Sequence, residues 1–111
     1  MIKDIFKVEL YKVKLTNIDN ESLVDYINNN IIIEEGTSNG KSKLNNDALT
    51  NDLFKDLNKQ VAEHVNKLFH RNVHNHFRLN LNEGWFNKNA DVEIITPHKH
   101  QHSVYSAVYY P

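Results

Sequence analysis

The sequence predicts an α+β domain in which helices pack on an antiparallel sheet or partial barrel. Apolar and charged residues alternate near the start of the chain, which is the period of a strand with one wet face. Between Asp47 and about His70, apolar residues recur every three or four positions, which is the period of a helix. Several short segments after residue 76 then return to a period of two. This order lacks the regular strand–helix alternation of doubly wound folds and favours an antiparallel sheet.

The composition bounds the class of protein before any motif is considered. At 111 residues the chain is one domain at most, or part of one. With 13 basic and 14 acidic residues, it offers no electrostatic basis for binding nucleic acid or a membrane surface. It has no cysteine, so any metal must be held by His, Asp or Glu. No apolar run approaches the roughly 18 residues of a membrane span. The opening residues lack a signal peptide's apolar core, so a cytoplasmic location is expected.

The first half of the chain predicts a strand, a short helix and a loop. Apolar residues alternate with charged ones from Phe6 to Leu15, with a phase slip near Tyr11 that predicts a bulge or two short strands. Asp19 or Asn20 is a candidate cap for a short helix that carries Leu23, Val24 and Ile27 on one side. The stretch "EEGTSNGKSKLNND", residues 34–47, holds two of the three glycines and predicts a loop.

The second half predicts one long helix followed by strands. The apolar stripe of the helix is expected to face the core, and it consists of Leu49, Leu53, Leu57, Val61, Val65 and Leu68. After the helix, residues 77–82 alternate strictly. The stretches "GWFN", "VEIIT" and "VYSAVYY" follow with short connections. The second half therefore contributes most of the predicted sheet.

Three histidines at alternate positions, His98, His100 and His102, are the strongest chemical signal. Alternate residues of a strand point to one face about 6.5–7 Å apart, so two imidazoles at this spacing can converge on one ion. Imidazole nitrogens suit Fe(II), Zn(II), Ni(II) or Cu(II). Apolar stretches flank His98 and His100 on both sides, which predicts an interior location. The remaining histidines are interpreted as surface or packing residues: His64, His70, His74 and His76.

Other chemistries lack their sequence signatures. The G-x-S-x-G elbow of serine hydrolases is absent, and "EGTSNGKSK" does not have the spacing of a phosphate-binding loop. No acidic residue follows the H-x-H pair as it would in a cupin. A simple His-rich site for divalent metals remains open.

Residues Trp85 to Tyr110 resemble a family of Fe(II)- and 2-oxoglutarate-dependent oxygenases found in bacteria and tailed phages. In that family a W-x-N strand leads through a turn to H-x-H, and five residues separate the second His from an S-G-V-Y-Y-like strand. Here Ala107 replaces the usual glycine. The matching residues are Trp85, Phe86, Asn87, His98, His100, Ser106, Val108, Tyr109 and Tyr110.

The resemblance implies that residues 1–111 form the N-terminal portion of a jelly-roll oxygenase-like domain. In it the N-terminal strand and helices pack on a partial double-stranded β-helix. His98 would be the first Fe(II) ligand, and His100 would stand where the wider superfamily has an acid. His102 would complete a three-His set unless a turn near Gln101 aims it elsewhere. Ser106 and Tyr109 would lie near the 2-oxoglutarate co-substrate, and the reaction would hydroxylate an unactivated C–H bond.

The chain departs from the family pattern in its late elements. The distal His ligand and the Arg that pairs with 2-oxoglutarate come from late strands in the family, and no arginine follows Arg78 here. This predicts a truncated reading frame, a split product or a remnant that binds without catalysis. A half-barrel exposes strand edges, so a homo-oligomer or a complementing chain is expected. The alternative function is a non-catalytic viral structural or interaction module. Whether the primary substrate is a small molecule or a protein stays open.

Overall fold

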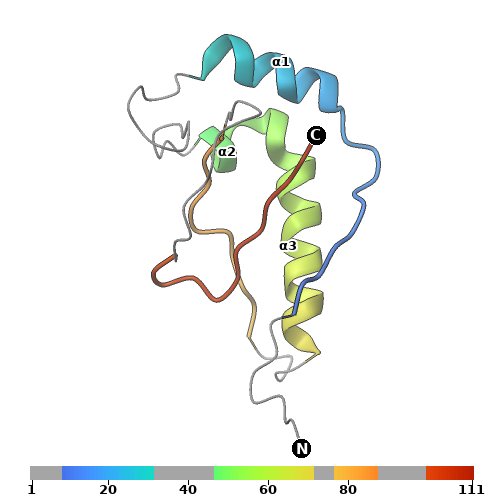
Figure 1. Cartoon of the computed structure of the whole chain (residues 1–111), viewed down its shortest axis with the longest axis vertical. Helices are drawn as coiled ribbons and strands as arrows, with labels where there is room; N and C mark the ends of the chain where they lie inside the picture. Colours follow the sequence, from blue (N-terminus) through green and yellow to red (C-terminus); the bar gives the residue numbers. More distant parts are fainter. Residues whose placement is uncertain (1–8, 32–46, 72–76, 88–99) are drawn as a thin grey trace, which may run out of the picture.

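The fold, obtained as a computed structural model, is helical in the part of the chain that it describes, which is residues 9–31, 47–71, 77–87 and 100–111 (Figure 1). Four helical elements lie in these ranges, and none of them is long and apolar enough to cross a membrane. The remaining described segments have no regular secondary structure and run alongside the helices. The elements are α1 (Asn20–Asn30), α2 (Asp47–Thr50), the 3₁₀ turn η1 (Asp52–Phe54) and α3 (Lys55–His70).

Helix α1 begins at a carboxylate cap, as the sequence predicts. The Asp19 carboxylate accepts hydrogen bonds from the Ser22 backbone N–H at 3.1 Å and from the Ser22 hydroxyl at 2.7 Å. The first of these bonds satisfies a backbone donor that has no partner inside the helix. Leu23 follows directly and is buried, so the cap and the first apolar contact lie within one turn.

The long helix predicted from Asp47 is interrupted at Asn51. The Asn51 side chain accepts a hydrogen bond from the Leu53 N–H at 3.0 Å, which ends α2 and starts the tighter turn η1. Asn, like Asp and Ser, favours such local bonds over a helix interior. Because the helix is interrupted, the residues that face the core are not the ones that a continuous helix would bury. Phe54 is the most deeply buried side chain, whereas Leu53 of the predicted stripe is exposed.

Residues 9–18 run antiparallel to α3 along one flank of the helix (Figure 1). The Gln60 amide accepts a hydrogen bond from the Thr16 N–H at 3.1 Å and donates one to the Thr16 carbonyl at 2.7 Å. One helical turn further, the Tyr11 hydroxyl and His64 Nδ1 are hydrogen-bonded at 3.2 Å. This segment is thus held by polar side chains of the helix.

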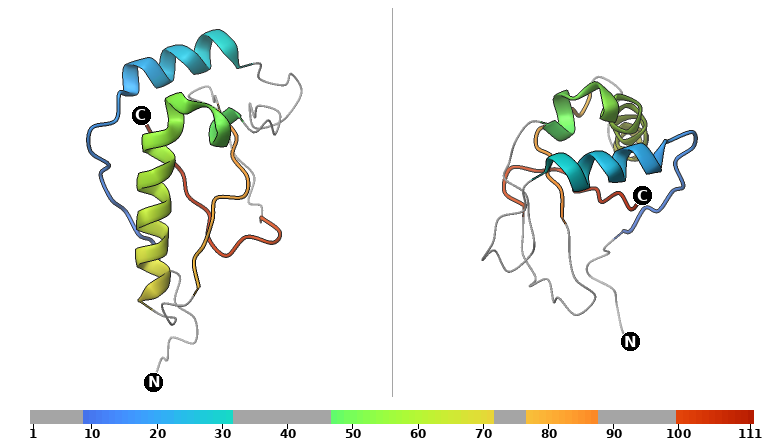
Figure 2. Two further views of the ribbon diagram at one scale, coloured as in Figure 1. Left: turned by 180° about the vertical axis from the view of Figure 1, so that it is seen from behind. Right: turned by 90° about the horizontal axis from the view of Figure 1, so that it is seen from above.

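Residues 77–87 run antiparallel to α3 along another flank, so α3 lies between the two segments (Figures 1 and 2). Asn66 holds this segment as Gln60 holds the first. Its Oδ1 accepts from the Leu79 N–H at 2.8 Å, and its Nδ2 donates to the Leu79 carbonyl at 2.9 Å. Nearer the end of the helix, His70 Nε2 donates to the Phe77 carbonyl at 2.8 Å.

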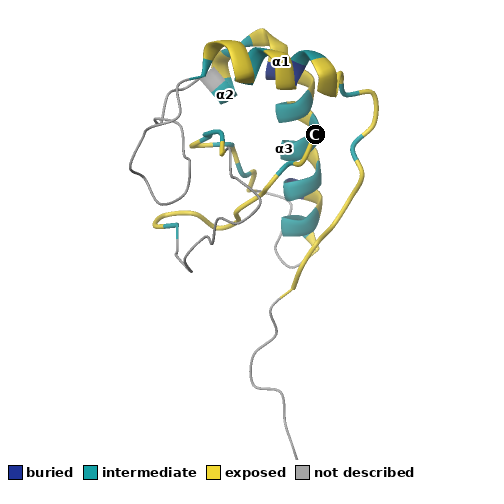
Figure 3. Ribbon diagram, turned by 45° about the horizontal axis from the view of Figure 1, so that its top comes forward, coloured by how far each residue is buried: buried dark blue, intermediate teal, exposed yellow. Residues whose placement is uncertain are grey.

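An aromatic cluster joins α1, η1 and residues 77–87. The Phe54 ring lies 5.6 Å from the Tyr26 ring, edge to face, and 5.3 Å from the Phe86 ring. Among the described residues, Phe54 and Leu23 are the only buried apolar side chains, at 2% and 3% exposure (Figure 3). The described part of the chain therefore has a small core at one end of α3.

The prediction of an α+β fold with a partial jelly-roll is wrong: within the described ranges there is no β-strand and no sheet. Residues 9–15 and 77–82, both predicted as strands, fall on different flanks of α3. Tyr11 of the first segment is bonded to His64, and Leu79 of the second is bonded to the Asn66 amide. Among the described residues, no hydrogen bond joins the two segments to each other. A β-ladder needs two backbones that exchange bonds, so alternation alone does not produce a strand. The predicted strand 92–96 lies outside the described residues, as do residues 34–46 of the predicted loop.

Candidate functional site

The residues between Trp85 and Tyr110 that match the oxygenase family are called the motif residues. Of these, His100 packs against Trp85. The two rings lie 5.2 Å apart between centroids, tilted by 36°. Both side chains are half-buried. This contact joins residues 77–87 to the C-terminal segment, so these two residues meet in space although they are fifteen positions apart in the sequence. His98 lies outside the described residues.

His102 lies on a turn and does not share a strand face with His100. The turn covers Gln101 and His102, and His102 has a left-handed backbone with φ of 63°. Non-glycine residues seldom adopt this conformation, except in turns. The spacing of two therefore does not align these two imidazoles, because the geometry that would do so is a strand. The side chain of His102 is exposed.

Ser106 and Tyr109, the candidates for binding the co-substrate, lie on the open C-terminal segment. Ser106 is exposed. Tyr109 is half-buried, and its hydroxyl donates a hydrogen bond of 2.5 Å to Asn20 Oδ1 at the first residue of α1. The Tyr109 hydroxyl thus ties the C-terminal segment to α1.

The donor chemistry of the motif suits Fe(II), but the described residues do not make up a complete metal site. A half-buried imidazole at His100 is an ordinary ligand for Fe(II). Among residues 9–31, 47–71, 77–87 and 100–111, however, no three His, Asp or Glu side chains lie together in a group that would hold a metal ion.

His64 and His70 are packing residues, as the sequence predicts. His64 contacts Tyr11 on one flank of α3, and His70 binds the Phe77 backbone on another. Because a carbonyl oxygen only accepts, His70 Nε2 carries the proton in that bond. His74 and His76 lie outside the described residues.

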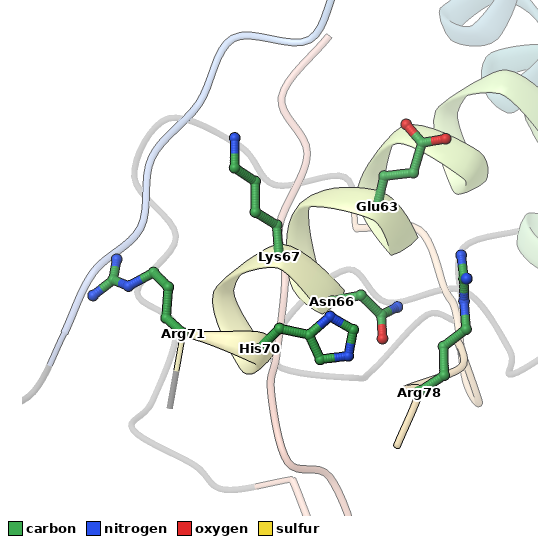
Figure 4. A pocket seen from close by; sticks show the side chains of 6 residues that line it. All are labelled: Glu63, Asn66, Lys67, His70, Arg71 and Arg78. Carbon is green, nitrogen blue, oxygen red and sulfur yellow. The ribbon is translucent and has the colours of Figure 1, made fainter. Parts of the chain in front are cut away.

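A shallow hollow of about 470 Å³ at the C-terminal end of α3 escaped prediction (Figure 4). It is lined by Glu63, Asn66, Lys67, His70, Arg71 and Arg78. The positively charged side chains that line the hollow do not point toward a common centre. Figure 4 shows Arg71 and Arg78 extending on opposite sides of the helix end, and Arg71 lies 3.8 Å from Glu9. Basic residues in the last turn interact favourably with the helix dipole, which accounts for Lys67 and His70. The hollow belongs to the scaffold that holds residues 77–79.

One titratable group of the scaffold is clearly perturbed. Hydrogen bonds from the Ser22 hydroxyl and then the Ser22 N–H lower the pKa of Asp19. The carboxylate is fully exposed, so the effect comes from stabilising its charged form and not from burial. Asp19 is a cap of α1 and lies outside the motif.

Comparison with known proteins gave no match: no family model, curated protein or solved structure is similar to this chain.

Proposed function

We propose that this chain is a Fe(II)-binding protein of the 2-oxoglutarate-dependent oxygenase type, with His98 and His100 as metal ligands. The proposal rests on one combination of observations. The sequence has a tryptophan, an H-x-H pair and a tyrosine pair in the register of that family, and His100 packs against Trp85. We propose a cytoplasmic location, which would be the host cytoplasm if a phage encodes the protein.

The Trp85–His100 contact gives the proposal a physical basis that does not depend on a barrel. A metal ligand must present its nitrogen in a fixed direction, and packing against a neighbouring side chain supplies that constraint. Half-burial also lowers the local dielectric and strengthens binding of a cation by nearby donors. The indole would thus orient the imidazole and partly shield it from water.

The roles of the remaining motif residues follow from their positions. His102, on its turn, is a candidate third ligand only if the turn brings it back toward the metal. Ser106 and Tyr109 are candidates for contacts with 2-oxoglutarate, and Tyr109 would have to exchange its bond with Asn20 for one with the co-substrate. When bound together, iron and 2-oxoglutarate supply oxidative hydroxylation of a C–H bond. A small molecule or a protein side chain would be the primary substrate.

The direct test is an anaerobic Fe(II) titration with and without 2-oxoglutarate, following the visible charge-transfer band of the iron–keto-acid chelate. The proposal predicts the band for the native chain, and its loss in His98→Ala and His100→Ala. His64→Ala is the matched control, because it removes an imidazole that contacts Tyr11 on α3 and leaves the motif intact.

The outcomes separate the competing functions. Iron binding without a band would mean a simple metal site, with no place for the co-substrate. An equal loss of binding in His64→Ala would mean that the histidines bind metal unspecifically. No binding at all would overturn the proposal in favour of the non-catalytic interaction module.

A further inference from the structure

We propose that residues 104–110, "VYSAVYY", pair with the same segment of a second copy as antiparallel strands, centred on Ala107. This segment does not include the proposed metal ligands His98 and His100. It does include Ser106 and Tyr109, the candidates for contacts with 2-oxoglutarate. The segment has the side-chain pattern of a strand, and its backbone has no hydrogen-bonded backbone partner among the described residues. Figure 1 shows this segment as an open chain that passes α3 and ends near α1.

One face of the segment is already used within the chain. The Tyr105 ring packs edge to face on Phe69 of α3, with ring centroids 6.5 Å apart. The Tyr109 hydroxyl is bonded to Asn20 of α1. The two odd-numbered tyrosines therefore anchor the segment against the helices, as alternate residues of a strand would.

The even-numbered face is apolar and open to solvent. Val104, Val108 and Tyr110 are 65%, 72% and 83% exposed, and Ser106 between them is also exposed. Valine and tyrosine favour paired strands, where they pack against cross-strand neighbours. Three large apolar side chains on one short stretch form the kind of patch that marks an interaction site.

Within the described residues, no N–H or C=O of residues 104–110 is hydrogen-bonded to another backbone group. Such an edge is a ready template for a further strand. Adding a strand gives main-chain hydrogen bonds for affinity, while the alternate side chains give specificity.

The chemistry of the segment points to a second copy as the partner. Residues 103–111 have no charged side chain, so a copy can approach without like-charge repulsion, and a charged peptide gains nothing here. A two-fold axis at Ala107 places Val104 opposite the partner's Tyr110, and Tyr105 opposite the partner's Tyr109. Aromatic–β-branched and aromatic–aromatic pairs are the favourable cross-strand combinations. The smallest side chain of the segment, Ala107, falls on the axis where identical residues meet.

The expected association is a weak, closed dimer. Seven-residue strands bury less than the roughly 1,200–2,000 Å² of stable complexes, so the dimer should depend on concentration. A two-fold axis pairs each segment once and generates no open-ended assembly. By sedimentation equilibrium, we expect the average mass to rise from 13.0 kDa toward twice that value as concentration increases.

Disulfide cross-linking tests the register directly, because the chain has no cysteine of its own. In Ala107→Cys the two thiols would lie on directly opposite residues, with Cα atoms about 4.5–5.5 Å apart, which is within disulfide range. In Ser103→Cys, the matched control on the same exposed segment, the two positions would lie about 27 Å apart across eight residues of strand. We expect Ala107→Cys to form disulfide-linked dimer at least ~10-fold faster than Ser103→Cys under mild oxidation.

A second pair of variants tests the exposed face. Val108→Lys should lower the dimer fraction, because it places two like charges beside the axis. Leu10→Lys, on the 9–18 segment and 90% exposed, should leave the dimer fraction unchanged. Equal cross-linking rates at positions 107 and 103 would overturn the antiparallel register. A mass of 13.0 kDa at all concentrations, or growth beyond a dimer, would overturn the proposal.

Discussion

Two side-chain amides of α3, those of Asn66 and Gln60, give a prediction in which burial decides how much stability a substitution costs. Asn66 and Gln60 each make two hydrogen bonds to the backbone of a single residue in a flanking segment. Asn66 is buried, at 5% exposure, whereas the bonds between Gln60 and Thr16 lie at the surface. Replacing either amide by alanine removes the same number of bonds to the flanking segment.

The expected cost differs because water replaces only the exposed bonds. In Asn66→Ala, two bonds to Leu79 of about 1 kcal/mol each are lost, together with the bond from Nδ2 to the Ala62 carbonyl. The part-buried Leu79 groups stay unsatisfied, so the loss is about 2–3 kcal/mol. The higher helix propensity of alanine returns up to about 0.7 kcal/mol, leaving about 2 kcal/mol. In Gln60→Ala, water takes over the hydrogen bonds to the Thr16 backbone. The higher helix propensity of alanine cancels most of the free energy that is still lost, so the net change is under about 0.5 kcal/mol.

Urea denaturation followed by far-ultraviolet circular dichroism measures both variants on the same helix. Asn66→Ala should shift the midpoint to lower urea with an unchanged slope. Amide exchange at Leu79 should accelerate in Asn66→Ala and not in Gln60→Ala. Equal free-energy losses in the two variants would refute the reasoning, because burial would then not set the value of these bonds.

Three further predictions concern the core, a close contact and the cap. Phe54→Ala should cost about 3–5 kcal/mol in the free energy of unfolding, against under about 1 kcal/mol for the exposed neighbour Leu53→Ala, both by urea denaturation. A Cβ at Gly84 would lie 3.0 Å from Ala48 Cβ and 3.3 Å from Leu49 Cδ2, so Gly84→Val should cost about 1–3 kcal/mol and lower the melting temperature. The lowered pKa of Asp19 means that its bonds to Ser22 stabilise the fold above the carboxyl's unfolded pKa. That contribution should vanish as pH falls through the lowered value, and Asp19→Ala should remove this acid dependence from the Ser22 amide signal in an NMR titration.

Local signals in the sequence predicted the helices well. Asp19 caps α1 as its residue type predicts, and the 3.6-residue period located α3. The pattern failed where two local preferences compete. Asn51 interrupts the predicted helix with its own side-chain bond, and the phase shift buries Phe54 in place of Leu53. The apolar period over the 24 positions of the predicted helix does not reveal a hydrogen bond that one side chain, Asn51, makes to the backbone.

The strands failed for a different reason. Alternation predicts which face of a segment is apolar, but pairing depends on a second segment that the pattern does not identify. Around α3, polar helix side chains take the backbone groups that a neighbouring strand would have taken, as Asn66 does for Leu79. For the candidate site, the spacing of two selected His100 and the family resemblance selected Trp85, and their contact is a feature that neither predicts. The alternation expected to align His102 with His100 ends at a turn.

The fluorescence of Trp85, the only tryptophan, tests the central claim most directly. A paramagnetic metal held by His98 and His100 would lie beside the indole, because the His100 ring is 5.2 Å from it. Under anaerobic titration with Co(II), a paramagnetic substitute for Fe(II), the account predicts saturable quenching near one equivalent, which is abolished in His100→Ala and preserved in His64→Ala. Quenching that persists in His100→Ala, or a bound metal that leaves the Trp85 emission unchanged, would contradict it.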